Sequence, residues 1–198
     1  SYIFGLKIGY QIFYSEQGRD FIKSIKGFPI FLDLKLHDIK NTIISALKSL
    51  KDIHNINYIS IHTSSGVEAI KAAKKITKVK LLGVTTLTSF NEINLKEIGY
   101  TKKIDQLIIH QAKIAKKAGC YAVICSGKES LKINKLVKIK TITPGIRLPG
   151  DKTNDQKRIT SPKDALIKYK ATGIVLGRSI SLGNIKNNFK RLFRNLES

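Results

Sequence analysis

The sequence predicts an α/β fold built on a parallel β-sheet. Short apolar runs alternate with longer stretches whose apolar residues recur at helical spacing, and this alternation is typical of repeated strand–helix units. The composition agrees, because 198 residues with 42% hydrophobic and 25% charged residues are typical of one globular domain. We find no linker, low-complexity tract or second domain in the sequence, so we expect a single domain over residues 1–198.

Seven apolar runs of strand length follow one another along the chain. Short apolar runs bounded by turn residues are typical of strands buried in a parallel sheet. In chain order the predicted strands are Tyr2–Ile8, Pro29–Leu34, Tyr58–Ile61, Lys80–Thr85, Ala122–Ser126, Lys140–Thr143 and Gly173–Leu176.

Helices are predicted between these strands, where apolar residues recur every three or four positions. The helix of Glu16–Lys26 places Phe21, Ile22 and Ile25 on one face. The other predicted helices are one with Ile43, Ile44, Leu47 and Leu50 inward, and those of Val67–Ile76, Ile104–Ala118, Ser161–Tyr169 and Ile185–Leu196.

Seven strand–helix units leave two parallel architectures open. An open, doubly wound sheet usually has about five or six strands, whereas a (β/α)8 barrel has eight strands in about 250 residues. The sequence contains no methionine, not even at position 1. We therefore expect a (β/α)8 TIM barrel whose first strand lies upstream of Ser1.

The charge is strongly basic, with 36 Lys and Arg against 14 Asp and Glu, for a formal net charge of +22. Such a balance is a first indication of a nucleic-acid-binding protein. Only six of these cations are Arg, however, and the lysines are dispersed from Lys7 to Lys190. We therefore expect no nucleic-acid partner.

Other features exclude further classes. No apolar run is long enough to cross a membrane, so we expect no membrane partner. Cys120 and Cys125 are too few for a disulfide framework, which favours a reducing compartment, the cytoplasm. The four histidines have no spacing typical of a metal site, and we expect no bound metal.

Charged residues gather at the end of the second predicted strand. Asp33 and Lys35 are two positions apart, so a strand directs both side chains to one face. Barrel enzymes place their catalytic groups at the carboxyl ends of strands, so the pair indicates an active site. Lys7 ends the first strand, and Asp38 and Thr42 follow shortly after Lys35. A surface salt-bridge cluster is the alternative interpretation.

Two later segments indicate a phosphate site. Thr143–Arg147 follows the sixth predicted strand, and Gly177 and Arg178 follow the seventh. Backbone N–H groups near a glycine, together with an Arg side chain, suit a phosphate group, which barrels commonly bind after their last two strands. Residues 149–161 have the length and polarity of a lid. A glycine turn with a solvated Arg is the alternative.

Together these motifs resemble those of the orotidine 5′-monophosphate decarboxylase family, in its order and spacing and over essentially all 198 residues. The Asp-x-Lys-x-x-Asp motif alone is shared with sugar-phosphate decarboxylases and aldolases, but the whole set is specific. The segments that carry the resemblance are Leu6–Gly9, Asp33–Thr42, Thr85–Ser89, Thr143–Arg147, Asp155–Gln156 and Val175–Arg178.

The resemblance implies a decarboxylation of orotidine monophosphate to uridine monophosphate that uses no cofactor. It implies that Lys35 donates a proton to pyrimidine carbon 6 and that Asp33 lies against the substrate carboxylate. It also implies that Lys7 hydrogen-bonds the ribose and orients Asp33.

The resemblance further implies a homodimer of barrels, in which Asp38 and Thr42 reach into the neighbouring subunit's site. Thr88 then contacts the pyrimidine of the small-molecule nucleotide. The implied phosphate ligands are Arg147, Gln156, Gly177 and Arg178.

The sequence departs from the family pattern at two points. The family's first strand carries a ribose-binding aspartate that does not precede Ser1 here, and the family's Gly before Asp-Gln is Asn154. Two alternative functions stay open: a metal-dependent sugar-phosphate lyase of the same suprafamily, and a non-catalytic, basic nucleic-acid-binding protein.

Overall fold

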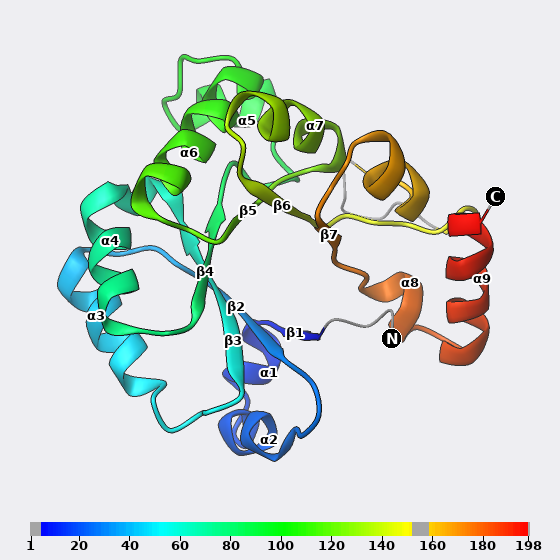
Figure 1. The fold of residues 1–198 in the computed structure, drawn as a ribbon, viewed down its shortest axis with the longest axis horizontal. Coiled ribbons are helices and arrows are strands. Elements are labelled where there is room, and N and C mark those ends of the chain that lie inside the picture. The colour runs from blue at the N-terminus through cyan, green and yellow to red at the C-terminus, as the bar shows by residue number, and fades with distance from the viewer. Residues whose placement is uncertain (1–4, 152–158, 198) are drawn as a thin grey trace. The chain divides into compact units, whose positions relative to one another are not determined.

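The computed structural model describes residues 5–151 and 159–197. These residues form an α/β fold with seven strands that follow the chain order in the sheet, and the strand pairs with a defined register are parallel (Figure 1). The strands are β1 (Leu6–Ile8), β2 (Ile30–Leu36), β3 (Ile56–His62), β4 (Lys80–Val84), β5 (Ala122–Ile124), β6 (Lys140–Thr143) and β7 (Gly173–Ile174).

Helices connect the strands, and several have the apolar spacing that the sequence predicted. The α-helices are α1 (Tyr10–Phe13), α2 (Gly18–Ser24), α3 (Lys40–Ser49), α4 (Gly66–Ile76), α5 (Glu92–Glu97), α6 (Ile104–Ala118), α7 (Gly127–Leu136), α8 (Arg178–Ser181) and α9 (Ile185–Glu197). A 3-10 turn, η1 (Thr63–Ser65), precedes α4, and a π-helical turn, η2 (Asp164–Lys168), precedes β7.

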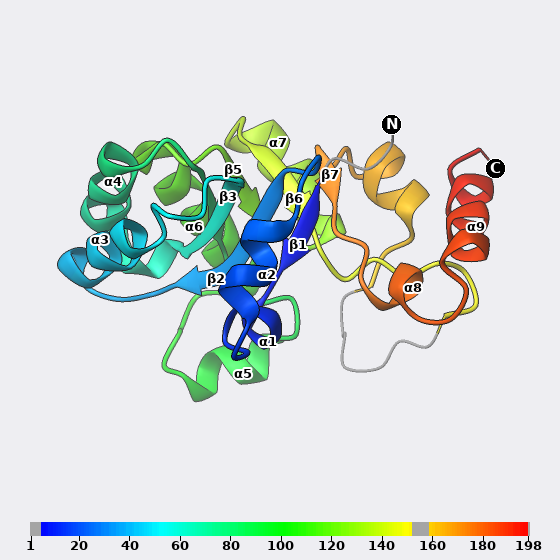
Figure 2. The same cartoon turned by 90° about the horizontal axis from the view of Figure 1, so that it is seen from below.

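The chain divides into two compact units, of which the first comprises residues 1–84 and 114–122. It holds β1 to β4, and α3 and α4 lie side by side against these strands (Figures 1 and 2). Apolar side chains of these strands and of α3 and α4 pack together in its core. The fully buried members include Ile30, Leu32, Ile43, Ile59, Ile61 and Ile70.

The second unit comprises residues 85–113 and 123–198. β6 pairs with β7, and the Cys125 N–H just after β5 donates to the Ile142 carbonyl at 3.2 Å. Ile146 follows β6 and packs in the core against Ala165 and Ala171. The neighbouring residue, Arg147, is thereby drawn into the protein interior.

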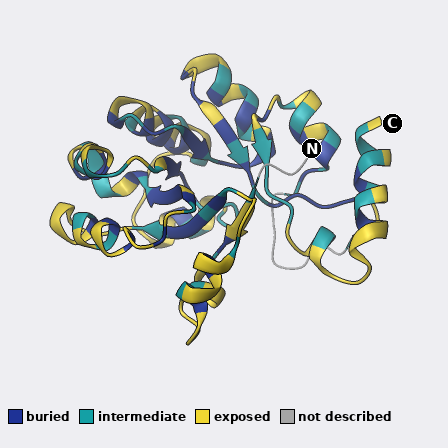
Figure 3. Ribbon diagram, turned by 60° about the horizontal axis from the view of Figure 1, so that its bottom comes forward, coloured by how far each residue is buried: buried dark blue, intermediate teal, exposed yellow. Residues whose placement is uncertain are grey.

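Burial follows the amphipathic pattern that the sequence predicted. Figure 3 shows buried residues along the strands and the inward helix faces, and exposed residues on the outward faces. No helix within residues 5–151 and 159–197 is long and apolar enough to cross a membrane.

The predicted elements agree with the structure in most places. α6 and β6 have the predicted bounds, while β2 and β3 extend further than predicted. The predicted apolar face of α2 is only partly covered: Phe21 is 51% exposed, and the seven-residue helix buries Gly18 and Ile22.

The helices α1, α5 and α7 were not predicted from the sequence. α1 and α5 have only four and six residues, too short for an apolar period to stand out. α7 could have been found, since Ser126 and Glu129 have the spacing of a capping box and the Ser126 N–H donates to the Glu129 carboxylate at 2.9 Å. The α/β class is confirmed, and closure into eight strands stays a prediction.

Candidate active site

A cluster of charges lies at the carboxyl ends of β1 and β2. The Asp33 Oδ2 atom accepts hydrogen bonds from Lys7 Nζ and Lys35 Nζ, each at 3.1 Å. The Asp33 side chain is 10% exposed, whereas the Lys7 and Lys35 side chains are 36% and 32% exposed. The structure thus brings together three of the predicted catalytic residues, with a buried anion beneath two cations that a ligand can reach.

A third donor to this carboxylate comes from β3. Ser60 Oγ donates to Asp33 Oδ1 at 2.8 Å. Burial disfavours the ionised carboxylate, but the charges of Lys7 and Lys35 and the Ser60 hydrogen bond outweigh burial and hold the pKa of Asp33 below its ordinary value. Asp33 is therefore an anion at neutral pH.

The backbone of β2 departs from regular strand geometry where the charged residues lie. Leu32 pairs with Ile59 and Leu36 pairs with Ile61, so a longer piece of β2 lies opposite a shorter piece of β3. Lys35, within this bulge, has φ of 43°, in the left-handed region that non-glycine residues rarely adopt. Its freed backbone N–H donates to Ser60 Oγ at 2.8 Å. Strain of this kind is typical of functional sites.

An aromatic ring adjoins the Lys35 ammonium. Nζ of Lys35 lies 5.5 Å from the centroid of the Tyr10 ring, within cation–π range. Tyr10 Oη donates to the Leu34 carbonyl at 2.7 Å, which fixes the ring against β2. Burial, Tyr14 and Asp33 raise the pKa of Tyr10, so the phenol is neutral.

Two histidines lie beside the cluster. The rings of His37 and His62 are 5.1 Å apart, and His37 Nε2 is 3.2 Å from Ser64 Oγ. Burial, followed by the charges of His37 and Lys35, lowers the pKa of His62 to about 4 against the opposing effect of Asp33. His62 is consequently a neutral group at the end of β3.

No hydrogen bond or ion pair joins Asp38 or Thr42 to this cluster among the described residues. Both are exposed, just before and within the first turns of α3. Asp38 Oδ1 accepts the N–H of Ile39 at 2.7 Å, and no ion pair joins Asp38 to Lys7 or Lys35 among the residues that the structure describes. Their predicted role in a neighbouring subunit's site stays a prediction.

The second unit contains a buried guanidinium. Arg147 is 8% exposed, and its Nη1 donates to the Ile146 carbonyl at 2.9 Å. Its Nε and Nη2 atoms have no hydrogen-bond partner within residues 5–151 and 159–197. Buried donors without partners are costly, so they are suited to an anionic ligand.

The segment after β7 adjoins Arg147. Ser179 Oγ donates to the same Ile146 carbonyl at 3.5 Å, which brings Gly177 and Arg178 close to the Arg147 segment. Both residues are exposed at the start of α8. Thr88 is half-buried in the loop after β4. Gln156 lies outside the described residues.

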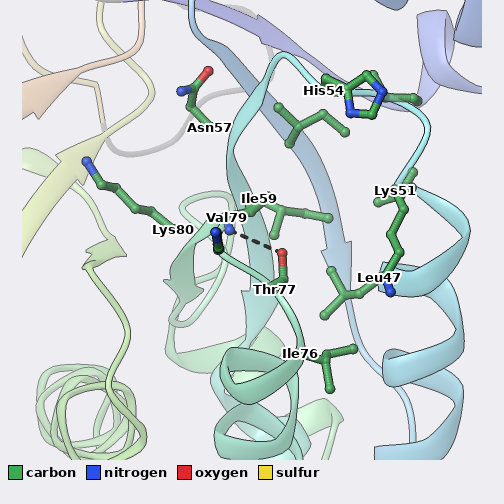
Figure 4. Close-up of a pocket in the computed structure, with 13 residues that line it drawn as sticks. Leu47, Lys51, His54, Asn57, Ile59, Ile76, Thr77, Val79 and Lys80 are labelled. Atoms are coloured by element: carbon green, nitrogen blue, oxygen red, sulfur yellow. Dashed lines mark hydrogen bonds between the residues drawn. The ribbon is translucent and has the colours of Figure 1, made fainter.

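A cavity of about 510 Å³ in the first unit lies elsewhere (Figure 4). It is lined by the last turns of α3 and α4 and by the first residues of β3 and β4, among them Leu47, Ile56, Ile76 and Lys80. The charged cluster lies at the opposite, carboxyl ends of the strands. None of the predicted site residues lines this cavity.

Sequence reasoning missed two residues of the cluster, Ser60 and Tyr10. Ser60 carried a usable signal, because a hydroxyl within the apolar run Tyr58–Ile61 is unusual in a strand covered on both faces. Tyr10 carried none, since its contact with Lys35 depends on the fold of α1.

The fold and the cluster define a class of protein. Parallel strands with charged side chains clustered at their carboxyl ends are typical of α/β enzymes, which bind their ligands at those ends. Residues 1–184 match the model of the Orotidine 5'-phosphate decarboxylase / HUMPS family, and this chain belongs to that family.

Individual relatives agree with the family match. The chain is 43% identical over 199 residues to orotidine 5'-phosphate decarboxylase of Buchnera aphidicola, covering 96% of this chain and 82% of the relative. It is 40% identical over 189 residues to the enzyme of that name from Ligilactobacillus salivarius, covering 89% and 78%. The crystal structure of the Lactobacillus acidophilus enzyme is similar with a TM-score of 0.80 and 31% identity, over 97% of this chain and 86% of that one.

Proposed function

We propose that this chain decarboxylates orotidine 5′-monophosphate to uridine 5′-monophosphate. The observation that carries the proposal is the Asp33 carboxylate held between the ammonium groups of Lys7 and Lys35. The decarboxylases of the same family, 43% and 40% identical to this chain, support this substrate.

The proposed reaction needs a fixed positive charge. The bond between pyrimidine carbon 6 and the carboxylate breaks, carbon dioxide leaves, and the electron pair stays on carbon 6. No cofactor delocalises this pair in the proposed reaction, so the Lys35 ammonium stabilises it and then transfers a proton to carbon 6. Solvent returns the proton to Lys35.

Asp33 and Lys7 complete the proposed catalytic group. Asp33, ionised and buried, lies against the substrate carboxylate and raises the energy of the bound substrate relative to the product. Lys7 hydrogen-bonds the ribose and orients Asp33 through the ion pair that joins them. The three residues therefore act as one unit, and loss of any of them affects the other two.

The phosphate of the substrate is assigned to Arg147. Its Nε and Nη2 atoms, which have no hydrogen-bond partner among the described residues, support this assignment. Binding energy from a group remote from the reacting bond can be used to order the catalytic charges. In the proposal Thr88 contacts the pyrimidine, and the other phosphate ligands are Gln156, Gly177 and Arg178.

We also propose the assembly and location of the protein. The seven strands belong to one (β/α)8 barrel domain, which pairs as a homodimer, with Asp38 and Thr42 of each subunit serving the site of the other. The similarity to the Lactobacillus acidophilus structure supports the fold. Two buried cysteines without a disulfide, Cys120 and Cys125, support a cytoplasmic location.

Turnover of orotidine monophosphate by the full native chain, with and without a metal chelator, tests the function. We expect uridine monophosphate to form equally in both conditions. Lys35→Ala is expected to lower kcat by about 10²- to 10⁴-fold, since the proton donor is lost, while uridine monophosphate still binds.

Other outcomes of this assay favour other functions. Formation of no product refutes the proposal. Activity on a sugar phosphate that requires magnesium favours the lyase alternative. Binding of nucleic acid that weakens steeply with salt, without turnover, favours a non-catalytic basic protein.

A further inference from the structure

Ser60 connects the two central residues of the charged cluster. Its side chain is completely buried in β3. Its Oγ atom lies 2.8 Å from Asp33 Oδ1 and 2.8 Å from the backbone nitrogen of Lys35. One hydroxyl thus contacts the side chain of one residue and the main chain of the other.

The direction of both hydrogen bonds is fixed by chemistry. The Lys35 N–H can only donate, so the Ser60 oxygen accepts from it. The hydroxyl has a single proton, and the Asp33 carboxylate can only accept, so that proton is directed at Oδ1. Ser60 therefore has one acceptable orientation, in which its oxygen accepts from the Lys35 N–H and its proton is directed at Asp33 Oδ1.

Each of these two hydrogen bonds has a separate role. Oδ2 of Asp33 is already shared by Lys7 and Lys35, and within residues 5–151 and 159–197 the donor to Oδ1 is Ser60, which thereby sets the rotation of the carboxylate. The bulge of β2 removes the Lys35 N–H from the ladder, and Ser60 accepts it instead. A buried N–H without a partner destabilises the conformation that exposes it.

We propose that Ser60 is a positioning residue for the decarboxylation: it fixes the Asp33 carboxylate and the left-handed backbone of Lys35, so that the Lys35 ammonium lies at the proton-transfer position. Ser60 touches neither the substrate nor the reacting atoms in this proposal. The inference rests on the proposed function for its kinetic consequences, but its effect on Asp33 is independent of turnover.

Ser60→Ala is the direct test, because it removes only the hydroxyl oxygen and keeps the volume of the side chain. We expect kcat to decrease by about 10- to 100-fold, equivalent to about 1.4–2.7 kcal/mol, because a hydrogen bond to a charged group is lost. The KM for orotidine monophosphate is expected to change by less than about threefold, because remote groups supply most of the binding.

The pH profile separates positioning from a merely structural role. The groups that face Asp33 are Lys7 from β1, Lys35 from β2, Ser60 and His62 from β3, and Tyr10 from α1. Loss of the Ser60 donor removes one interaction that favours the ionised carboxylate, so the pKa of Asp33 rises. The acid limb of the kcat profile is therefore expected to move to higher pH.

Two variants serve as controls. Ser130→Ala removes an equally buried serine hydroxyl, one that bonds Thr141 in the second unit, and should leave the acid limb in place. Ser60→Thr keeps the hydroxyl and should restore kcat toward the wild-type value; thermal unfolding shows whether each variant is folded at the assay temperature.

The effect of Ser60 on Asp33 can be measured apart from turnover. A ¹³C NMR titration of the Asp33 carboxyl in wild type and Ser60→Ala reports the pKa without turnover. If wild type does not turn over orotidine monophosphate, the proposed function fails while an upward shift still supports positioning. If Ser60→Ala has the wild-type kcat, acid limb and NMR titration, or only the effects of Ser130→Ala, the inference is overturned.

Discussion

A buried carboxylate is tolerated in this protein because every one of its oxygens has a donor. Asp33 receives hydrogen bonds from Lys7, Lys35 and Ser60, and its pKa lies below the ordinary value although the side chain is buried. Removal of any partner leaves part of a buried charge uncompensated, which is expensive in a protein interior. The same arrangement that stabilises the anion also concentrates two ammonium groups at one place.

Arg147 allows the phosphate assignment to be tested apart from catalysis. We expect Arg147→Met to raise the Kd of uridine monophosphate by about 10- to 100-fold, because charged hydrogen bonds to phosphate are lost. The Kd of uridine, which has no phosphate, should not change. Isothermal titration calorimetry of both ligands measures the difference.

A matched variant controls for charge alone. Arg194→Met removes an exposed guanidinium from α9 and should leave both affinities unchanged. A similar loss of uridine and uridine monophosphate affinity in Arg147→Met would show that Arg147 supports the fold of the second unit and does not bind phosphate.

His62 makes stability depend on pH in a definite direction. The pKa of His62 is about 4 in the folded protein, because of burial and nearby cations, against 6.5 for an ordinary imidazole. Between these values the unfolded chain binds a proton that the folded chain does not, so the free energy of unfolding falls as pH falls from 6.5 toward 4. Below the folded pKa this contribution is constant.

His62→Gln removes this contribution. We expect urea unfolding measured at several pH values to show a shallower loss of stability in His62→Gln than in wild type between pH 6.5 and 4. Parallel stability curves across that range would contradict the assignment of a depressed pKa to His62.

At the residue scale, the sequence predicted those contacts of the charged cluster that follow from local spacing and from position at a strand end. The spacing of Asp33 and Lys35, and the place of Lys7 at a strand end, were enough to predict that these groups meet. Ser60 and Tyr10 join them through the register between β2 and β3 and through the fold of α1. Such contacts join distant parts of the chain, and local spacing does not contain them.

At the scale of elements, the bulge of β2 is the feature that shapes the site. Regular alternation predicts that Asp33 and Lys35 share a face, and their contact is present. The contact is made, however, with Lys35 in a left-handed conformation and with a shifted register between β2 and β3. Sequence periodicity assumes a regular strand, so it could not predict this departure.

The strain at Lys35 has a measurable consequence for stability. A β-carbon in the left-handed conformation costs about 1–2 kcal/mol, and glycine avoids that cost. Lys35→Gly and Lys35→Ala both remove the amine, so they differ chiefly in backbone conformation. We expect Lys35→Gly to be more stable than Lys35→Ala by about 1 kcal/mol, measured by urea unfolding.

This order is the reverse of the one expected in a regular strand. There glycine is less stable than alanine by about 0.5–1 kcal/mol, because it loses more backbone entropy on folding. If Lys35→Ala proves the more stable variant, the φ of 43° at Lys35 does not describe a conformation under strain.

Helix boundaries were predicted best where the apolar period was long. α6, with 15 residues, has its predicted bounds, whereas α1 has four residues and was missed. α2 shows a different limit: it has seven residues, and Phe21 is exposed although the period placed it on one face with the buried Ile22. Helical period identifies a face, but the length of the helix decides how much of that face is covered.

At the scale of the whole molecule, the net charge of the protein does not identify its ligand. The net charge of +22 is carried mainly by dispersed lysines, while only six arginines are present. One of these scarce residues, Arg147, is buried, and its Nε and Nη2 atoms have no hydrogen-bond partner in the part of the chain that the structure describes. The basic composition thus gives no reason to prefer a nucleic acid over one phosphorylated small molecule as the ligand.

The proposed dimer predicts activity from two inactive chains. If Asp38 of one subunit serves the site of the other, Asp33→Ala and Asp38→Ala homodimers are both inactive, but each mixed dimer has one site with neither substitution. Random reassociation makes about half of the dimers mixed, so about a quarter of wild-type activity should return.

Asp33→Ala mixed with Lys35→Ala is the matched control, because every site then carries one substitution and no activity should return. The measurement is turnover after mixing, with subunit exchange verified by native mass spectrometry. If mixed dimers of Asp33→Ala and Asp38→Ala form but have no activity, Asp38 lies in the site of its own subunit or outside the site.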